Sequence, residues 1–213
     1  MSALTQSHVR GRTDVPLLDM TIGQNFEEVA ARHGNRDALV VRHQDIRWSY
    51  AEMNAKADQL AAALVAQGLT KGDRIGIWSP NRYEWVLTQY ATAKVGLVLV
   101  NINPAYRVSE LDYALNKVGC KALILSPQFK TSNYVEMVQG LIPELDKATP
   151  GAVESARFPA LKILIQLGPE PAPGMLSFDE VMSRADEGRA EAQKLAKTLS
   201  PDDPINIQFT SGT

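Results

Sequence analysis

The sequence predicts an α/β protein of three layers, in which a mostly parallel sheet is flanked by helices. Short apolar runs alternate with longer amphipathic stretches along most of the chain, a pattern typical of strands joined by helical crossovers. The apolar runs are continuous, which indicates strands buried on both faces. Residues 20–68 depart from this pattern and predict a hairpin followed by a helix. Residues 1–20 are expected to form a loosely ordered arm.

The hairpin-plus-helix segment is predicted from β-prone runs and a helix start signal. Ala38–Val41 and Ile46–Ser49 flank a polar turn. A helix should begin after Ser49, because Ser49 and Glu52 have the spacing of a capping box. Gly68 is the expected end of this helix. Its apolar face has helical spacing: Met53, Ala57, Leu60 and Leu64.

The parallel sheet is predicted from five further apolar runs. The strands are expected near residues 74–78, 97–100, 121–125, 161–165 and 205–209. Helices are expected at 82–95, 109–118, 133–141, from 178 onward, and at 190–199.

Caps and breakers set the expected bounds of these elements. Asn81 and Ser109 are predicted N-caps, and Gly96 and Gly119 are predicted C-terminal stops. Ser177, with Glu180 three residues later, should open another helix. Residues 143–160 hold three prolines and few large apolar groups, so we expect a surface loop there, and residues 168–174 are expected to be a stiff linker.

Composition excludes several classes of protein. Hydrophobic residues make up 45% of the 213 residues and charged residues 22%, so a disordered or collagen-like chain is excluded. The formal charge of −2 provides no basic field for nucleic acid or anionic lipid, and we expect no nucleic-acid partner. No apolar run approaches the roughly 20 residues of a membrane-spanning helix.

The cysteine and histidine residues indicate which cellular compartment and which metal sites to expect. Cys120 is the single cysteine, which excludes an internal disulfide and favours a reducing compartment. The histidines, His8, His33 and His43, are scattered, so no closed zinc site and no metal site is expected. Residues 1–14 lack the apolar core of a signal peptide. We therefore expect a cytoplasmic protein.

Motif searches leave one candidate site. The sequence has no G-x-G-x-x-G, so a dinucleotide-dependent dehydrogenase is disfavoured, and it has no G-x-x-x-x-G-K-[ST], G-x-S-x-G or H-E-x-x-H. The last strand is followed by Thr210, Ser211, Gly212 and Thr213. A hydroxyl- and glycine-rich turn of this kind can bind phosphate through N–H and O–H groups. A plain polar tail is the alternative.

Other conspicuous residues have structural interpretations. Cys120 opens a strand, which favours a buried structural thiol over a reactive one. Trp48, Trp78 and Trp85 are expected in the core or at a domain seam. The segment 103–106 should shape a turn, with contact to an acyl group or a partner as the alternative.

Four stretches, in their order and spacing, resemble segments of AMP-forming acyl-CoA synthetases, which belong to the adenylate-forming superfamily. They are Ile46–Met53 (IRWSYAEM), Lys71–Asn81 (KGDRIGIWSPN), Ala93–Pro104 (AKVGLVLVNINP) and Thr210–Thr213 (TSGT). The last one resembles the opening of the family's phosphate loop. The resemblance covers the N-terminal part of such a protein and implies that residues 210–213 bind nucleotide phosphate.

The resemblance implies a two-step reaction with ATP, Mg²⁺ and CoA. A carboxylic acid and ATP give an acyl-adenylate and pyrophosphate, and CoA then gives acyl-CoA and AMP. Val100–Arg107 (VNINPAYR) resembles fatty-acyl-CoA synthetases more than peptide-synthetase domains. Medium- to long-chain fatty acids are therefore the favoured substrates, and an aryl acid remains open.

The resemblance also implies an incomplete domain. Residues 21–213 would be the N-terminal portion of an AMP-binding domain, truncated within the phosphate loop, and residues 20–68 would belong to a second, incomplete sheet. The family's catalytic lysine lies beyond the match, so we expect no catalytic residue in this chain. The isolated chain should be inactive, bind ATP, Mg²⁺ and CoA weakly, and expose apolar surface that makes it a candidate homo-oligomer.

Three alternatives stay open at this point. The chain could be a non-catalytic assembly or binding module of the same ancestry. It could instead belong to an adenylation domain that acylates a carrier protein rather than CoA. Peripheral attachment to the inner membrane is the alternative to a free cytoplasmic location.

Overall fold

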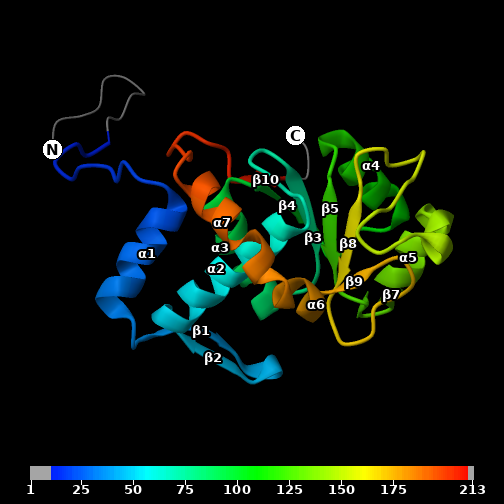
Figure 1. Cartoon of the computed structure of the whole chain (residues 1–213), viewed down its shortest axis with the longest axis horizontal. Coiled ribbons are helices and arrows are strands. Elements are labelled where there is room, and N and C mark those ends of the chain that lie inside the picture. Colours follow the sequence, from blue (N-terminus) through cyan, green and yellow to red (C-terminus); the bar gives the residue numbers. More distant parts are fainter. Residues whose placement is uncertain (1–10, 211–213) are drawn as a thin grey trace, which may run out of the picture.

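The computed structural model describes residues 11–210 and has a six-stranded parallel sheet at its centre (Figure 1). The strand order is β10-β4-β3-β5-β8-β9, and every neighbouring pair is parallel. The strands are β3 (Arg74–Trp78), β4 (Val98–Ile102), β5 (Ala122–Leu125), β8 (Ile163–Gln166), β9 (Leu176–Ser177) and β10 (Asn206–Gln208). The five predicted strands are confirmed. The sixth, β9, was not predicted because two residues are too few to form a pattern.

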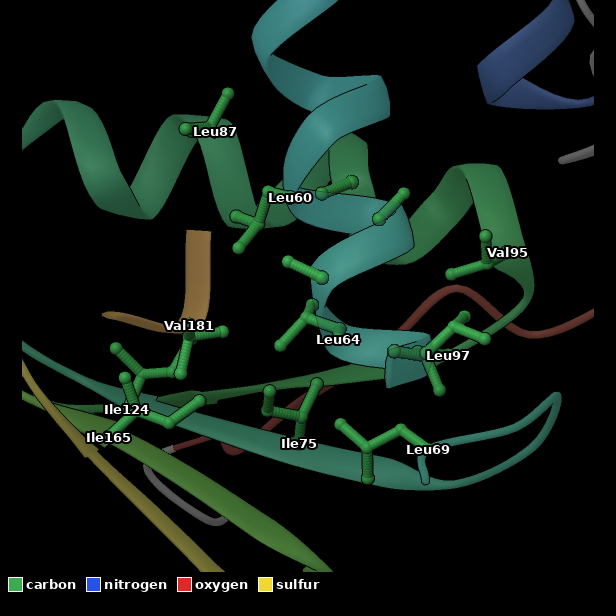
Figure 2. Close-up of a cluster of buried hydrophobic side chains, with 14 of the residues drawn as sticks. Leu60, Leu64, Leu69, Ile75, Leu87, Val95, Leu97, Ile124, Ile165 and Val181 are labelled. Atoms are coloured by element: carbon green, nitrogen blue, oxygen red, sulfur yellow. The ribbon is translucent and has the colours of Figure 1, made fainter. Parts of the chain in front are cut away.

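Five helices lie on one side of the sheet. Of these, α2 (Tyr50–Ala66), α3 (Tyr83–Val95) and α6 (Phe178–Ser183) cover the strands, whereas α1 (Ile22–His33) and α7 (Ala185–Ala196) pack mainly on α2 and α3. Figure 2 shows Leu60 and Leu64 of α2 above Ile75, Ile124 and Ile165 of the strands, and all five side chains are fully buried. Alternation along each strand sends these residues to this face.

The opposite face is covered by α4 (Val108–Val118), α5 (Tyr134–Leu141) and the short helix η2 (Pro143–Lys147). Strand residues one position away from those of the first face point here: Val100, Ile102, Leu123, Leu125 and Leu164. The predicted three-layer α/β architecture is therefore confirmed.

Residues 143–160 form the predicted surface segment, with one addition. The segment is irregular apart from η2 and most of its residues are exposed, but Leu145, Val153 and Phe158 are buried against α4, α5 and the sheet and anchor it to the core. The few large apolar residues in it are the ones that pack, and the prolines only shape the chain between them.

Two small antiparallel sheets lie outside the main sheet. The hairpin β1 (Asp37–Val41) and β2 (Ile46–Ser49) is joined by a turn containing η1 (Arg42–Gln44), as predicted. Figure 1 places this hairpin beside the start of α2. A second hairpin, β6 (Gln128–Phe129) and β7 (Ser132–Asn133), follows β5.

Helix α1 was not predicted, although its start signal is present. The Thr21 hydroxyl accepts from the Gln24 N–H at 3.2 Å, and the Gln24 side chain accepts from the Thr21 N–H at 3.0 Å. This is the reciprocal pairing of a capping box. Few of the helix residues are buried (Gly23, Phe26 and Ala30), so the apolar pattern was too sparse to indicate a helix.

The predicted caps are partly right. The Ser49–Glu52 and Ser177–Glu180 starts are confirmed by hydrogen bonds to the Ser hydroxyls, and Gly96 and Gly119 end α3 and α4 in the left-handed conformation. Gly68, also left-handed, lies two residues after α2.

The predicted N-caps Asn81 and Ser109 are wrong, because Arg82 and Arg107 hold the extended N-cap positions. The Ser109 hydroxyl instead donates to Glu110 within the first turn of α4.

Helix α7 begins at Ala185, five residues before the predicted start, because it packs closely on α2. A Cβ at Gly188 would lie 2.0 Å from the Ala62 carbonyl oxygen, so the approach of the two helices depends on this glycine.

Candidate functional site

The topology of the sheet indicates where a ligand would be expected. Open parallel sheets bind ligands beyond the carboxyl ends of their strands, at the point where neighbouring connections run in opposite directions. Here β3 leads to β4 on one side, and β5 leads to β8 on the other. The topological switch point therefore lies between the carboxyl ends of β3 and β5.

The crevice at this switch point is filled by side chains. Ser79 and Ser126 directly follow β3 and β5, and their hydroxyl oxygens are 2.7 Å apart. Trp78, the last residue of β3, stacks on Tyr134 of α5 with the ring centroids 3.6 Å apart. All four side chains are at most 1% exposed, so they leave no room for a ligand.

The open volume lies instead at the carboxyl ends of β4 and β10. Two hollows flank the end of β10. The first, which we call the α4 hollow, has a volume of about 550 Å³ and is lined by Tyr106, Ser109, Glu110, Tyr113, Lys117, Gln208, Phe209 and Thr210. The second, which we call the α3 hollow, has a volume of about 440 Å³ and is lined by Trp85, Asn101, Ile102, Asn103, Pro104, Gln208 and Phe209.

The pairing of β10 with β4 brings these residues together. Gln208 is in register with Asn101, so the end of β10 lies beside the polar end of β4. The Trp85 indole N–H donates to the Asn101 side-chain oxygen at 3.1 Å, which ties α3 to this edge. Tyr113 contacts Phe209 with the ring centroids 6.5 Å apart, across the α4 hollow.

Hydrogen bonds set the charge state of the α4 hollow. Glu110 accepts from the Arg107 N–H at 3.1 Å and from the Ser109 hydroxyl at 3.0 Å. A hydrogen bond from its own backbone N–H, followed by those from Arg107 and Ser109, lowers the pKa of Glu110 and so stabilises its carboxylate form. Lys117 provides a positive charge on the same helix.

The structure places only the first of the predicted phosphate-binding residues. Thr210 follows β10, is exposed and lines the α4 hollow. Ser211, Gly212 and Thr213 lie outside the described residues. Tyr106 belongs to the 103–106 segment, for which ligand contact was the alternative to a plain turn, and it lines the α4 hollow; the aromatic lining residues Tyr113 and Phe209 were not predicted. No local signal could have found them, because α4 and β10 meet through the pairing of two strands distant in the sequence.

The described residues do not fit a Mg²⁺ site. Within residues 11–210 no three His, Cys, Asp or Glu side chains gather closely enough to hold a metal ion. Among the side chains that line the two hollows, Glu110 carries the only carboxylate. Mg²⁺ needs oxygen ligands in an octahedral arrangement, so we derive no step through magnesium from these residues.

The structural interpretations of Cys120 and the tryptophans are confirmed. Cys120 is 1% exposed, and burial raises the pKa of its thiol to about 12, so it is neutral and unreactive. Trp78 is fully buried, and Trp48 and Trp85 are half-buried against the helices of the first face.

Comparison with known proteins identifies the family. The family model described as AMP-binding enzyme matches residues 26–213. The chain belongs to the AMP-binding enzyme family.

Curated relatives agree with this assignment. The chain is 46% identical over 209 residues to a medium-chain acyl-CoA ligase, ACSF2, from Rattus norvegicus, and 47% identical over 210 residues to the corresponding ligase from Homo sapiens. Both are named as mitochondrial proteins, and each comparison covers 97% of this chain. The chain spans 34% of the length of each relative.

A solved structure supports the fold. The apo structure of MbtA from Mycobacterium smegmatis matches with a TM-score of 0.71 over 92% of this chain and 32% of that chain, at 22% sequence identity. The predicted family and the predicted α/β fold are thus confirmed. In residues 11–210, no helix combines the length and apolarity that crossing a bilayer requires.

Proposed function

We propose that this chain is part of an ATP-dependent, AMP-forming acyl-CoA synthetase, called the parent protein below. The observation that carries the proposal is the family match together with the position of the Thr210–Thr213 sequence, which begins at the open carboxyl end of β10. Residues 21–213 are proposed to be the N-terminal portion of its AMP-binding domain, ending within the phosphate loop. Residues 37–49 are proposed to belong to a second sheet completed elsewhere in the parent.

The proposed reaction has two steps. A carboxylate oxygen of the acid attacks the α-phosphorus of ATP, the bond to the β-phosphate breaks, and pyrophosphate leaves. The thiol of CoA then attacks the acyl carbon of the adenylate, loses its proton to solvent, and displaces AMP. In the first step Thr210, Ser211, Gly212 and Thr213 bind phosphate oxygens through backbone N–H groups and hydroxyls, and so stabilise the charge on the departing pyrophosphate.

The acid is proposed to be a medium-chain fatty acid. Two observations support this: the relatives are named medium-chain acyl-CoA ligases, and the 100–107 segment resembles fatty-acyl-CoA synthetases. A cytoplasmic location is also proposed, on the basis of the single buried cysteine, although the relatives are named as mitochondrial. Cell fractionation with an antibody to the parent protein tests the location.

The isolated chain is proposed to be catalytically inactive. Its open hollows are lined from α3, α4, β4 and β10, and a site that must exclude water from an acyl-adenylate needs more walls than these elements provide. ATP, Mg²⁺ and CoA are therefore substrates and cofactor of the parent. A tight complex with the fragment alone is not expected.

The test measures AMP release by the full-length parent protein with octanoate, ATP, Mg²⁺ and CoA. We expect AMP and acyl-CoA in equal amounts, and a loss of at least tenfold in kcat/KM for ATP in a Thr213→Val variant, because a hydroxyl donor to a developing charge is removed. Thr198→Val, after α7 and before β10, is the matched control and should retain full activity.

Other outcomes would contradict the proposal. Octanoate-dependent AMP release without CoA, accompanied by acylation of a carrier protein, would support the carrier-loading alternative. Absence of any acid-dependent pyrophosphate or AMP from the full-length protein would support a non-catalytic module.

Self-association of the isolated chain is proposed on separate grounds. Leu17 and Leu18 are 95% and 69% exposed, an apolar pair that a monomer rarely leaves in water. Light scattering should show a mass above that of a monomer, and Leu17→Ser/Leu18→Ser should lower it. A monomer at all concentrations would contradict this proposal.

A further inference from the structure

The turn formed by residues 103–106 is held from behind by two buried aromatic side chains. It follows β4 and leads into α4, so it lies between the two hollows. Asn103 and Pro104 line the α3 hollow, whereas Tyr106 lines the α4 hollow. Both hollows share Phe209, the residue that precedes Thr210.

Each aromatic side chain donates one hydrogen bond to the turn. The Trp78 indole N–H donates to the Asn103 carbonyl at 3.1 Å, and the Tyr134 hydroxyl donates to the Pro104 carbonyl. The two rings are stacked at 3.6 Å with an angle of 10° between their planes. They therefore act as one rigid unit that contacts two consecutive carbonyl groups.

The turn also has its own hydrogen bonds. The Asn103 side-chain oxygen accepts from the Ala105 N–H at 2.9 Å, and the Asn103 carbonyl accepts from the Tyr106 N–H at 3.0 Å. These local bonds define the shape of the turn but not its place relative to the sheet. Its place is set by the two bonds from the buried pair.

Packing alone does not explain these two side chains. Both are fully buried. At position 134 phenylalanine would fill nearly the same volume without a hydroxyl in the core, and at position 78 an apolar side chain would avoid burying an indole N–H. The polar tips are aimed at carbonyls of a turn that is itself largely exposed, where water could satisfy the acceptors. What the buried donors add is a defined position of the turn.

We propose that Trp78 and Tyr134 are positioning residues for adenylate formation, acting through the 103–106 turn on the wall beside Phe209 and Thr210. This inference rests on the proposed function, because it assumes that the segment after β10 binds the phosphates of ATP. The pair itself touches no substrate. Its effect is to hold the Asn103–Pro104 wall where the phosphate-binding segment begins.

The test uses Trp78→Phe and Tyr134→Phe in the full-length parent protein. Tyr134→Phe keeps the ring and removes only the hydroxyl donor, whereas Trp78→Phe removes the indole N–H and also makes the buried ring smaller. Adenylate formation is measured by acid-dependent exchange between ATP and pyrophosphate without CoA, and the second step by the reaction of synthetic octanoyl-AMP with CoA. Trp48→Phe is the matched control, since the Trp48 ring is half-buried and its indole N–H makes no hydrogen bond among residues 11–210.

We expect each variant to lower kcat/KM for ATP in the exchange reaction about tenfold, the size of effect that a small misplacement of reacting groups produces. The rate with octanoyl-AMP and CoA should stay close to that of the parent and of Trp48→Phe in both variants. The melting temperature should stay close to that of the parent in Tyr134→Phe and should fall in Trp78→Phe, because the smaller ring leaves part of a fully buried site empty.

Two results would overturn the inference. An unchanged rate of ATP–pyrophosphate exchange in both variants would show that adenylate formation does not need the two hydrogen bonds to the turn. Equal losses in both half-reactions that follow a lower melting temperature would show a purely structural role. If the unmodified parent shows no acid-dependent exchange, the proposed function itself is wrong. This result differs from the two above, so failure of the proposed function and failure of this inference can be told apart.

Discussion

The two crevices at the carboxyl edge of the sheet differ in what fills them. Between β3 and β5, Trp78, Ser79, Ser126 and Tyr134 close the space completely. Between β4 and β10, the corresponding space is open on both sides of the strand end. Both crevices belong to the same sheet, and both are bounded by parallel neighbours.

This difference shows that topology alone does not decide where a parallel sheet has room for a ligand. The rule of the switch point identifies the β3/β5 crevice, but a large aromatic residue at the last position of β3 and another at the start of α5 occupy it. Among the described residues, strand β10 lies at the edge of the sheet and pairs with β4 alone. The open space is found where packing is incomplete.

The largest effect should come from emptying the closed crevice. Trp78→Ala removes a fully buried ring and its stack with Tyr134, and it should lower the free energy of unfolding by about 3–5 kcal/mol. Urea denaturation of the chain, followed by circular dichroism, measures this loss. A loss below about 1 kcal/mol would mean that the crevice is not packed as described.

Buried groups on the side of the closed β3/β5 crevice should also make the free energy of unfolding fall at high pH. Burial raises the pKa of the Cys120 thiol and of the Tyr134 hydroxyl to about 12 in each case, from ordinary values of 9.0 and 10.0. Between pH 9 and 12 the unfolded chain loses these protons while the folded chain keeps them, so stability is full below pH 9 and falls as pH rises. The slope should be about 1 kcal/mol per pH unit for each group.

A variant isolates the contribution of the thiol. Cys120→Ala should be less stable than the unaltered chain at pH 8, but its stability should fall less steeply from pH 9 to 11 in urea titrations. Equal slopes for the two proteins would contradict the assigned burial of the thiol.

The pair of serine hydroxyls should contribute less than the aromatic stack. Ser126→Ala removes one partner of a buried hydrogen bond and should lower the free energy of unfolding by about 1–2 kcal/mol. In the double variant Ser79→Ala/Ser126→Ala, the loss should be smaller than the sum of the single losses, because the two groups interact directly. Additive losses would show that the two hydroxyls are independent.

The smallest effect is expected at the open end. Tyr113 is 59% exposed on the wall of the α4 hollow, so Tyr113→Ser should change the free energy of unfolding by less than about 0.5 kcal/mol. Urea denaturation of Tyr113→Ser and Trp78→Ala under the same conditions tests this contrast. A loss as large as that of Trp78→Ala would show that the α4 hollow is a packed region.

Local patterns predicted most of the fold. The apolar runs at β3, β4, β5 and β8 predicted these strands, because residues buried on both faces leave a nearly continuous hydrophobic sequence. Strand β10 is exposed at its first and last residues, and it was predicted from alternating apolar residues. The Ser49 and Ser177 starts and the Gly96 and Gly119 stops were predicted because caps depend on neighbouring residues only. The same order of motifs predicted the AMP-binding family, which the family match confirms.

Other features depended on contacts between distant parts of the chain. Helix α1 and strand β9 are held by their neighbours rather than by strong patterns of their own. The three buried anchors of the 143–160 surface segment were not predicted, because Leu145, Val153 and Phe158 are scattered in sequence and meet only in the folded core. The starts of α3 and α4 also differed from the predicted caps.

The sequence by itself determined the α/β class, the order of the strands along the chain and the family. Hydrophobic periodicity and short motifs indicate these properties, and both depend on residues close to one another in sequence. Only the tertiary structure decided that the β3/β5 crevice is closed, that β10 pairs with β4, and that a stacked Trp78–Tyr134 pair holds the 103–106 turn. Packing between residues tens of positions apart settles these points, and no local pattern records which side chains will meet.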